Sequence, residues 1–257
     1  MQHTYETLQL NVHEHVATLT LNRPDSRNAL NLQMCRELTA ACAVLRSSDE
    51  VHVVLIRGNG PAFCAGADLK ERQHMSVEEM VARRVEGFTA YGAIEVLPMP
   101  VIALVHGPAF GSGAEIAAAC DYVLGDSQAT FRYPEVGWGT VGATQRLPRI
   151  VGRRMAKELL FTGRTIDATE ALKLGLLNHI YATENLEREA LEMAHAIAQC
   201  NPLTVRLTKA SIDDGLETTR RGAMAVELLA IQENLRNSDW KKAIANFGSK
   251  KGERHGA

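Results

Sequence analysis

The apolar residues in the first half of the chain fall into short runs that stop at turn residues. Residues 16–21 combine apolar side chains with threonine and end at Asn22-Arg23-Pro24, which predicts a strand followed by a turn. Residues 51–56 and 101–105 are almost wholly apolar, a pattern typical of strands buried on both faces. Residues 122–124 are a further short run. These runs predict a sheet that is covered on both sides.

Helix signals lie between these strands. Asn31 is a capping residue in front of apolar positions that recur with helical spacing as far as Leu45. Ser76 and Glu79 form a capping-box pattern, which predicts a helix that continues to about residue 95. Small residues over 113–120 predict another helix. The alternation of strand, loop and helix predicts an α/β architecture.

The pattern changes after about residue 182, where strand signals give way to three predicted helices at 184–199, 202–214 and 216–236. We therefore expect a core at 1–182 and a helical segment at 183–257. The last helix carries an apolar stripe, which packs either on its own domain or between subunits. The stripe consists of Met224, Leu228, Ile231 and Leu235.

Composition narrows the class of protein. A net charge of -2 gives no basic field for nucleic acid or anionic membranes. The chain begins without the basic and apolar segments of a signal peptide, and it has no apolar run long enough to span a bilayer. Its five cysteines are scattered and form no CxxC pair, which favours free thiols in a reducing compartment. We expect a cytoplasmic enzyme.

Two glycine-rich loops follow the second and third predicted strands, at residues 61–70 and 106–115. Ligands of α/β proteins bind at the carboxyl ends of strands, and small residues there let a ligand approach backbone N–H groups. Either loop alone is explained by a tight turn. Two such loops in matching positions indicate a site where two amides bind a developing oxyanion.

Several cofactor and nucleophile motifs are missing. Gly111-Ser112-Gly113 begins like a dinucleotide-binding loop but lacks the third glycine, and no phosphate-binding GxxxxGK motif is present. Ser112 is not a hydrolase nucleophile of the GxSxG type, because Phe110 stands where glycine is required. The nine histidines show no metal-ligand spacing. We expect no metal and no cofactor.

Two glutamates are candidates for acid–base chemistry. Glu115 lies on a helix of otherwise apolar or small residues, and Glu135 lies in a loop after residues 130–131. Two carboxylates beside an oxyanion site can divide acid and base roles on one water. The alternatives are a buried, hydrogen-bonded Glu115 without a catalytic task, and a Glu135 that pairs with Arg132 or Arg146.

The chain resembles the enoyl-CoA hydratase/isomerase (crotonase) family over essentially its whole length. Its phrases occur in family order: LNRP at 21–24, NAL at 28–30, FCAGADL at 63–69, GSGAE at 111–115, CD at 120–121, PE at 134–135 and TQRLPR at 144–149. The resemblance implies a crotonase-like spiral of ββα turns with a C-terminal helical trimerisation segment, assembled as a homotrimer or a dimer of trimers. It also gives the stripe on 224–235 a role between subunits.

The resemblance further implies a reaction and its residues. The reaction is addition of water to a 2-enoyl-CoA, as in fatty acid metabolism, with coenzyme A as part of the substrate. The backbone N–H groups of Ala67 and Ser112 would form the oxyanion hole, and Glu115 and Glu135 would be catalytic. Coenzyme A contacts are implied for Arg27, Ala65, Asp68 and Leu69, and for Phe247 and Lys250 from a neighbouring subunit.

Two departures from the family pattern affect this prediction. Ser112 stands where glycine is common, and the stretch from Glu135 to Thr144 is about three residues shorter than the usual hydratase loop. The shorter loop can redirect Glu135 and place Trp138 in the pocket. Isomerisation of the double bond, and hydrolysis of a CoA thioester or β-diketone, are therefore the alternative reactions. A non-catalytic RNA-binding homologue is a further alternative, but both glutamates are present and only 5% of residues are aromatic.

Overall fold

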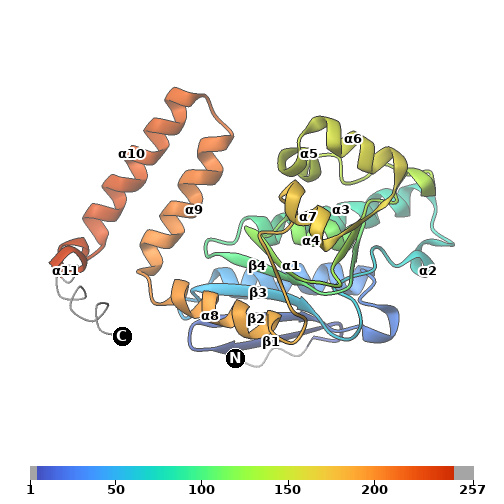
Figure 1. Cartoon of the computed structure of the whole chain (residues 1–257), viewed down its shortest axis with the longest axis horizontal. Helices are drawn as coiled ribbons and strands as arrows, with labels where there is room; N and C mark the ends of the chain where they lie inside the picture. The colour runs from blue at the N-terminus through green and yellow to red at the C-terminus, as the bar shows by residue number, and fades with distance from the viewer. Residues whose placement is uncertain (1–4, 246–257) are drawn as a thin grey trace. The chain divides into compact units, whose positions relative to one another are not determined.

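The computed structural model describes residues 5–245, which form two compact units divided after Ala198. The first unit is a mixed α/β structure, as predicted (Figure 1). The division falls after the predicted boundary at residue 182, because the helix α8 (Leu186–Ala198) belongs to the first unit. Its buried residues Leu186, Ala190 and Ala194 pack against the sheet.

The larger sheet has the strand order β1-β2-β3-β4-β6-β9. Its strands are β1 (Leu8–His13), β2 (Val16–Leu21), β3 (Val53–Gly58), β4 (Val101–Val105), β6 (Tyr122–Asp126) and β9 (His179–Tyr181). β1 and β2 form an antiparallel hairpin, and every other pair is parallel. The carboxyl ends of β3 and β4 therefore lie at the same edge, where both glycine-rich loops begin.

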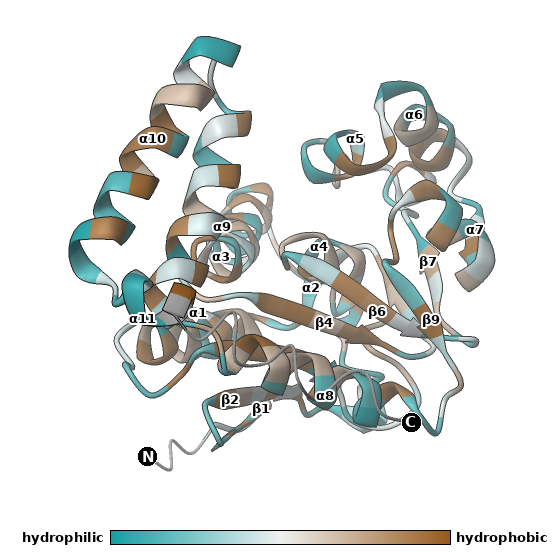
Figure 2. Ribbon diagram, turned by 60° about the vertical axis from the view of Figure 1, so that its left-hand side comes forward, coloured by the Kyte–Doolittle hydropathy of each residue, from teal (hydrophilic) through white to brown (hydrophobic). Residues whose placement is uncertain are grey.

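Both faces of this sheet are covered, which explains the continuous apolar runs. Val53 and Leu55 of β3 pack with α8, whereas Val54 and Ile56 belong to the main core on the opposite face. Figure 2 shows hydrophobic residues along β4 and β6 in the middle of the unit. The predicted burial of these strands on both faces is thus confirmed.

The first unit also contains a second sheet, which has three strands. It consists of β5 (Pro108–Phe110), β7 (Thr130–Arg132) and β8 (Thr165–Asp167), in that order. Isolated parallel bridges join Leu30 to Ala67 and Cys64 to Ala109. Each turn of the chain is therefore hydrogen-bonded to the next, which places the two glycine-rich loops side by side.

The helices of the first unit cover these sheets. They are α1 (Leu32–Arg46), α2 (Leu69–Arg72), α3 (Val77–Glu95), α4 (Ser112–Ala118), α5 (Arg146–Val151), α6 (Arg153–Thr162), α7 (Ala168–Leu174) and α8, with 3-10 turns η1 (Pro24–Ser26) and η2 (Val136–Trp138). Asn31 caps α1, and Ser76 forms the predicted capping box with Glu79.

The second unit contains α9 (Pro202–Leu216), α10 (Arg220–Asn237) and α11 (Trp240–Ala245). α9 and α10 pack against each other as an antiparallel pair, with Thr204 hydrogen-bonded to Asn234. The predicted stripe on α10 stays largely exposed within the chain, from 46% at Leu235 to 64% at Met224. Among the described residues, no helix is long and apolar enough to cross a membrane.

Candidate functional site

The two glycine-rich loops meet in a contact that leaves no room for a side chain. A Cβ on Gly113, in the first turn of α4, would overlap the carbonyl oxygen of Cys64. Cys64 in turn donates its N–H to Pro108 O and accepts from Phe110 N, each at 3.0 Å. The two loops are therefore held together by backbone contacts.

Ala67 of the first loop and Ser112 of the second both line one cavity of about 190 Å³. Leu30 bonds to Gly66 O and Asp68 N, the neighbours of Ala67, so the N–H of Ala67 itself points to the other side of the bridge. Ser112 is the first residue of α4, and its N–H has no acceptor within the helix.

Glu115 reaches the same cavity from α4, one turn after Ser112. It is 7% exposed, and its Oε2 lies 3.2 Å from Nη1 of Arg146. Its Oε1 is buried and has no hydrogen-bond partner among the described residues. Arg146 also pairs with Glu95 at 2.7 Å, so this guanidinium holds Glu115 in place from the surface side. One carboxylate oxygen is thus left without a hydrogen-bond partner in the described part of the chain.

Glu135 lines the same cavity as Glu115. A Cβ on Gly142 would lie 2.8 Å from its Cγ, and one on Gly111 would lie 3.0 Å from its Oε1. The buried Oε2 of Glu135 has no partner in the described part of the chain. The alternative that Glu135 pairs with Arg132 or Arg146 is wrong, since Arg132 donates to Gly163 O and Arg146 binds the two other glutamates.

Burial changes the acidity of both carboxyl groups. Desolvation raises the pKa of Glu115 from its usual range, Arg146 opposes that rise, and the charge of Glu135 adds to it. Desolvation also raises the pKa of Glu135, where Arg84 and Arg72 act in the opposite direction. The environments differ in one respect: Glu115 has a directly bonded cation and Glu135 does not.

The shortened loop is fixed by Arg84 of α3. Its guanidinium donates to Val141 O at 2.7 Å and to the hydroxyl of Thr140. Trp138 lines the cavity and is 65% exposed. These contacts hold the loop against α3.

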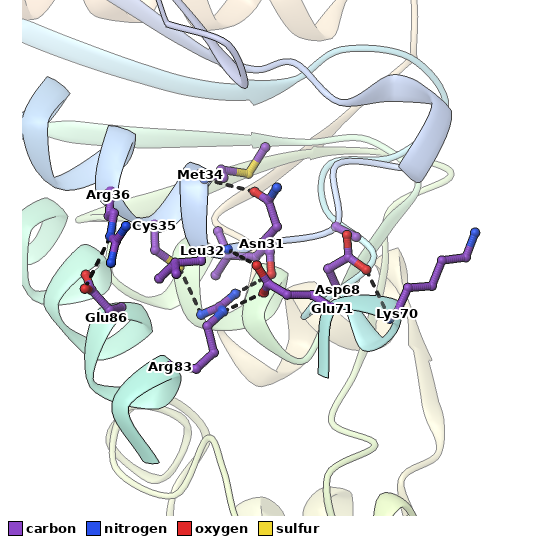
Figure 3. A network of polar contacts seen from close by, with 12 residues as sticks. Asn31, Leu32, Met34, Cys35, Arg36, Asp68, Lys70, Glu71, Arg83 and Glu86 are labelled. Atoms are coloured by element: carbon purple, nitrogen blue, oxygen red, sulfur yellow. Dashed lines mark hydrogen bonds and ion pairs between the residues drawn. The ribbon is translucent and has the colours of Figure 1, made fainter. Parts of the chain in front are cut away.

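A polar network fixes α2, which follows the first glycine-rich loop (Figure 3). Arg83 of α3 bonds Glu71 of α2 at 2.7 Å and Leu30 O at 2.6 Å. Glu71 also accepts from Leu32 N at 2.7 Å. These contacts join α1, α2 and α3 around the loop that carries Ala67.

The residues predicted to contact coenzyme A are only partly brought together. Ala65 and Leu69 line the cavity, and Arg27 accepts from Ala65 N at 2.9 Å through its carbonyl oxygen. Asp68 bonds Arg23 at 3.0 Å and caps α2, so its carboxylate is engaged within the chain. Phe247 and Lys250 lie outside the described residues.

Comparison with known proteins gives the family. The sequence model of the enoyl-CoA hydratase/isomerase family matches residues 11–255. The chain belongs to the enoyl-CoA hydratase/isomerase family. It is 38% identical over 251 residues to the crotonyl-CoA hydratase of Syntrophomonas wolfei, with 96% of each chain covered. It is also 38% identical over 240 residues to the short-chain-enoyl-CoA hydratase of Clostridium acetobutylicum, with 92% of each covered.

Solved structures of the family agree with this assignment. The enoyl-CoA hydratase of Bacillus anthracis superimposes with a TM-score of 0.93 at 33% identity, covering 95% of this chain and 97% of that one. The crotonase fold predicted from the sequence is therefore confirmed, and the chain is an enoyl-CoA hydratase-like enzyme.

The sequence did not reveal the side chains that complete the site of this family member. Arg72, Arg84 and Tyr91 line the cavity from α2 and α3. Burial raises the pKa of Tyr91, and a hydrogen bond with the Ser112 side chain opposes that rise. The hydroxyl that distinguishes Ser112 from the usual glycine thus has a partner. The only sequence signal was the density of arginines between residues 72 and 84.

The contact between Gly113 and Cys64 predicts a large effect of a small substitution. Gly113→Ala should lower the free energy of unfolding by about 1–3 kcal/mol, because the added methyl forces the two loops apart. Urea unfolding followed by circular dichroism measures this. Gly92→Ala on α3 is the matched control, since an added Cβ there meets nothing within 4 Å. Equal stability of the two variants would contradict the prediction.

Proposed function

We propose that this enzyme adds water across the double bond of a 2-enoyl-CoA thioester. The observation that carries the proposal is the pair of buried carboxyl groups, each with an unpartnered oxygen among the described residues, that line one cavity together with Ala67 and Ser112. Hydration needs these parts together, because the thioester must be polarised while one group takes a proton from the water and another delivers a proton to the α-carbon. The crotonyl-CoA and short-chain-enoyl-CoA hydratases among its relatives support the same reaction.

The oxyanion hole is assigned to the N–H groups of Ala67 and Ser112. As water attacks the β-carbon, charge moves to the thioester oxygen, which becomes enolate-like. Two preorganised amide donors in a partly enclosed site stabilise that charge without the solvent reorganisation that water would need. Because the two amides come from loops that are packed backbone to backbone, their separation is fixed before the substrate binds.

The two glutamates divide the proton transfers. The ion pair with Arg146 favours the ionised form of Glu115, which suits it to orient and deprotonate the water. Glu135 is buried without a directly bonded cation, which favours its protonated form and suits it to deliver a proton to the α-carbon. The reaction then needs no metal and no cofactor beyond the coenzyme A of the substrate.

Coenzyme A would bind along the segment that leads into the cavity. The residues assigned to it are Arg27, Ala65, Asp68 and Leu69, with Asp68 acting through its backbone because its carboxylate is bonded to Arg23. Leu69 is 47% exposed beside the cavity, where it offers an apolar surface to the pantetheine arm.

The enzyme is further proposed to assemble as a homotrimer or a dimer of trimers through its second unit. Met224, Leu228 and Ile231 follow one another at helical spacing on α10, and each is about half exposed or more within the chain. A contiguous apolar stripe of this kind is a signature of an interface. A second copy of the chain is the occupant that the family resemblance implies.

The first test is loss of the ultraviolet absorbance of crotonyl-CoA. We expect rapid loss with the wild-type enzyme, and a fall in kcat of roughly 10²–10⁴-fold in both Glu115→Gln and Glu135→Gln, because each removes a positioned proton-transfer group. Glu184→Gln, an exposed change outside the site, is the control. Calorimetric binding of butyryl-CoA should change little in all three variants.

Two outcomes of that test would reject parts of the proposal. Near wild-type activity in either glutamine variant would remove that residue from the mechanism. Intact binding of butyryl-CoA without any hydration of crotonyl-CoA would keep the family and discard hydration. Isomerisation and thioester hydrolysis would then be assayed with the same protein.

The ion pair of Glu115 predicts a shift in the pH profile. Arg146 opposes the burial that raises the pKa of Glu115, so Arg146→Met should raise that pKa further. Because Glu115 acts as the ionised base, the acid limb of kcat/KM should move to higher pH. Arg146→Lys keeps a charge and should move the limb less. An unchanged acid limb in Arg146→Met would show that Glu115 is not the base.

Assembly is tested by size-exclusion chromatography with light scattering. The wild-type protein should have three or six times the mass of one chain, as a trimer or dimer of trimers requires. Leu228→Arg should lower that mass, because a charge in an apolar interface is costly to desolvate. Val12→Arg, at an exposed position on β1, is the control. A monomeric wild-type protein would reject the interface.

A further inference from the structure

Three arginines from α2 and α3 line the same cavity as the two glutamates: Arg72, Arg83 and Arg84. Arg83 is neutralised within the chain, since its side chain is 2% exposed and its Nε lies 2.7 Å from Oε2 of Glu71. In the part of the chain that the structure describes, neither Arg72 nor Arg84 forms an ion pair with a carboxylate. Two guanidinium groups therefore bring positive charge to the cavity that no neighbouring side chain neutralises by direct contact.

Arg72 is the more distinctive of the two. Its Nε is buried and has no hydrogen-bond partner among the described residues. Burial, together with the charges of Arg83 and Arg84, lowers the pKa of Arg72. A half-buried cation beside two others is destabilising unless a ligand supplies an anion. The network that fixes Glu71 also fixes the short helix from which Arg72 extends.

Arg84 uses its hydrogen bonds on neutral acceptors. The carbonyl oxygen of Val141 and the hydroxyl of Thr140 orient its guanidinium but leave its charge in place. It also lies close to Gly142, where an added Cβ would be 3.4 Å from its Nη1. Arg84 is thus held at the wall of the cavity beside Glu135.

The two glutamates that line the cavity do not neutralise both Arg72 and Arg84. Glu115 is paired with Arg146. Glu135 is the carboxyl group on which Arg72 and Arg84 act, and their charges lower its pKa only against a larger effect of burial. In its proposed role as proton donor Glu135 is neutral, and both arginines then lack a counter-charge.

The position of this charge separates it from the phosphates of coenzyme A. Arg72 and Arg84 lie beside Glu135, where the reacting carbons of the acyl group must sit. The diphosphate of coenzyme A is held away from the thioester by the length of the pantetheine arm. The positive charge therefore faces the acyl end of the substrate.

We propose that the preferred acyl group carries a carboxylate at the end remote from the thioester, bound by Arg72 and Arg84. This inference rests on the proposed function and names its substrate class: enoyl-CoA thioesters of dicarboxylic acids. Guanidinium groups bind carboxylates with short, charge-assisted hydrogen bonds, so a terminal carboxylate satisfies donors that an alkyl chain leaves unpaired.

Binding of unreactive thioesters tests the inference without requiring any reaction. Glutaryl-CoA and pentanoyl-CoA have acyl chains of the same length and differ in the terminal carboxylate. By calorimetry, the full-length wild-type protein should have a Kd for glutaryl-CoA at least about 10-fold lower than its Kd for pentanoyl-CoA. A charged hydrogen bond in a cavity provides a difference of this size. Arg72→Met should remove most of that preference, and Arg72→Lys, which keeps the charge, should retain part of it.

Arg154→Met is the control, because it removes the same charge from an exposed position on α6. Equal binding of the two thioesters by the wild-type protein would overturn the inference. So would an Arg72→Met variant that weakens both thioesters equally, since Arg72 would then serve only to position Glu135 and the loop. Because the wild-type comparison and Arg72→Lys suffice, poor folding of Arg72→Met would not prevent a decision.

The outcome is separable from that of the proposed function. Rapid hydration of crotonyl-CoA without any preference for glutaryl-CoA would keep the reaction and reject the substrate class. A clear preference for glutaryl-CoA, with no hydration of either crotonyl-CoA or the dicarboxylic enoyl thioester glutaconyl-CoA, would keep the acyl-group selectivity and reject the reaction.

Discussion

The close approach of Gly113 to the carbonyl oxygen of Cys64 is the constraint on which the site depends. It brings the first turn of α4 against the loop that carries Ala67, so the two candidate oxyanion donors share one cavity wall. Glu115 follows one helical turn later and is positioned by the same contact. A close-packed backbone junction of this kind is rigid, which is what preorganised electrostatic stabilisation requires.

The carboxyl groups of Glu115 and Glu135 lie near this junction in different electrostatic environments. Both are desolvated, and desolvation favours the neutral acid in each. A directly bonded guanidinium then favours ionisation of Glu115, whereas Glu135 is influenced by arginines only at longer range. The difference in bonding, rather than in burial, is the basis of their proposed roles as base and acid.

The sequence was a good guide where a signal is local. Apolar runs predicted β2, β3, β4 and β6, and the caps at Asn31 and Ser76 predicted the starts of α1 and α3. The three-residue strands of the second sheet were missed, since their hydrogen bonds join distant turns. The sequence also did not predict which unit α8 belongs to. A stripe of leucine and alanine indicates that one face of the helix is buried, but not which unit it packs against. Likewise, nothing local distinguishes Arg72 from Arg83, because only the fold decides which of them Glu71 neutralises.

The shortened loop connects acid–base chemistry with substrate choice. Gly142 lets both Glu135 and Arg84 approach the loop closely, so the same few residues position the proposed proton donor and the positive charge. A substrate carboxylate bound by Arg72 and Arg84 would neutralise the two charges that lower the pKa of Glu135. That neutralisation favours the protonated form of Glu135. A dicarboxylic enoyl thioester would thus favour the protonated form of Glu135, which its own hydration requires. A neutral acyl chain would leave Glu135 more readily ionised.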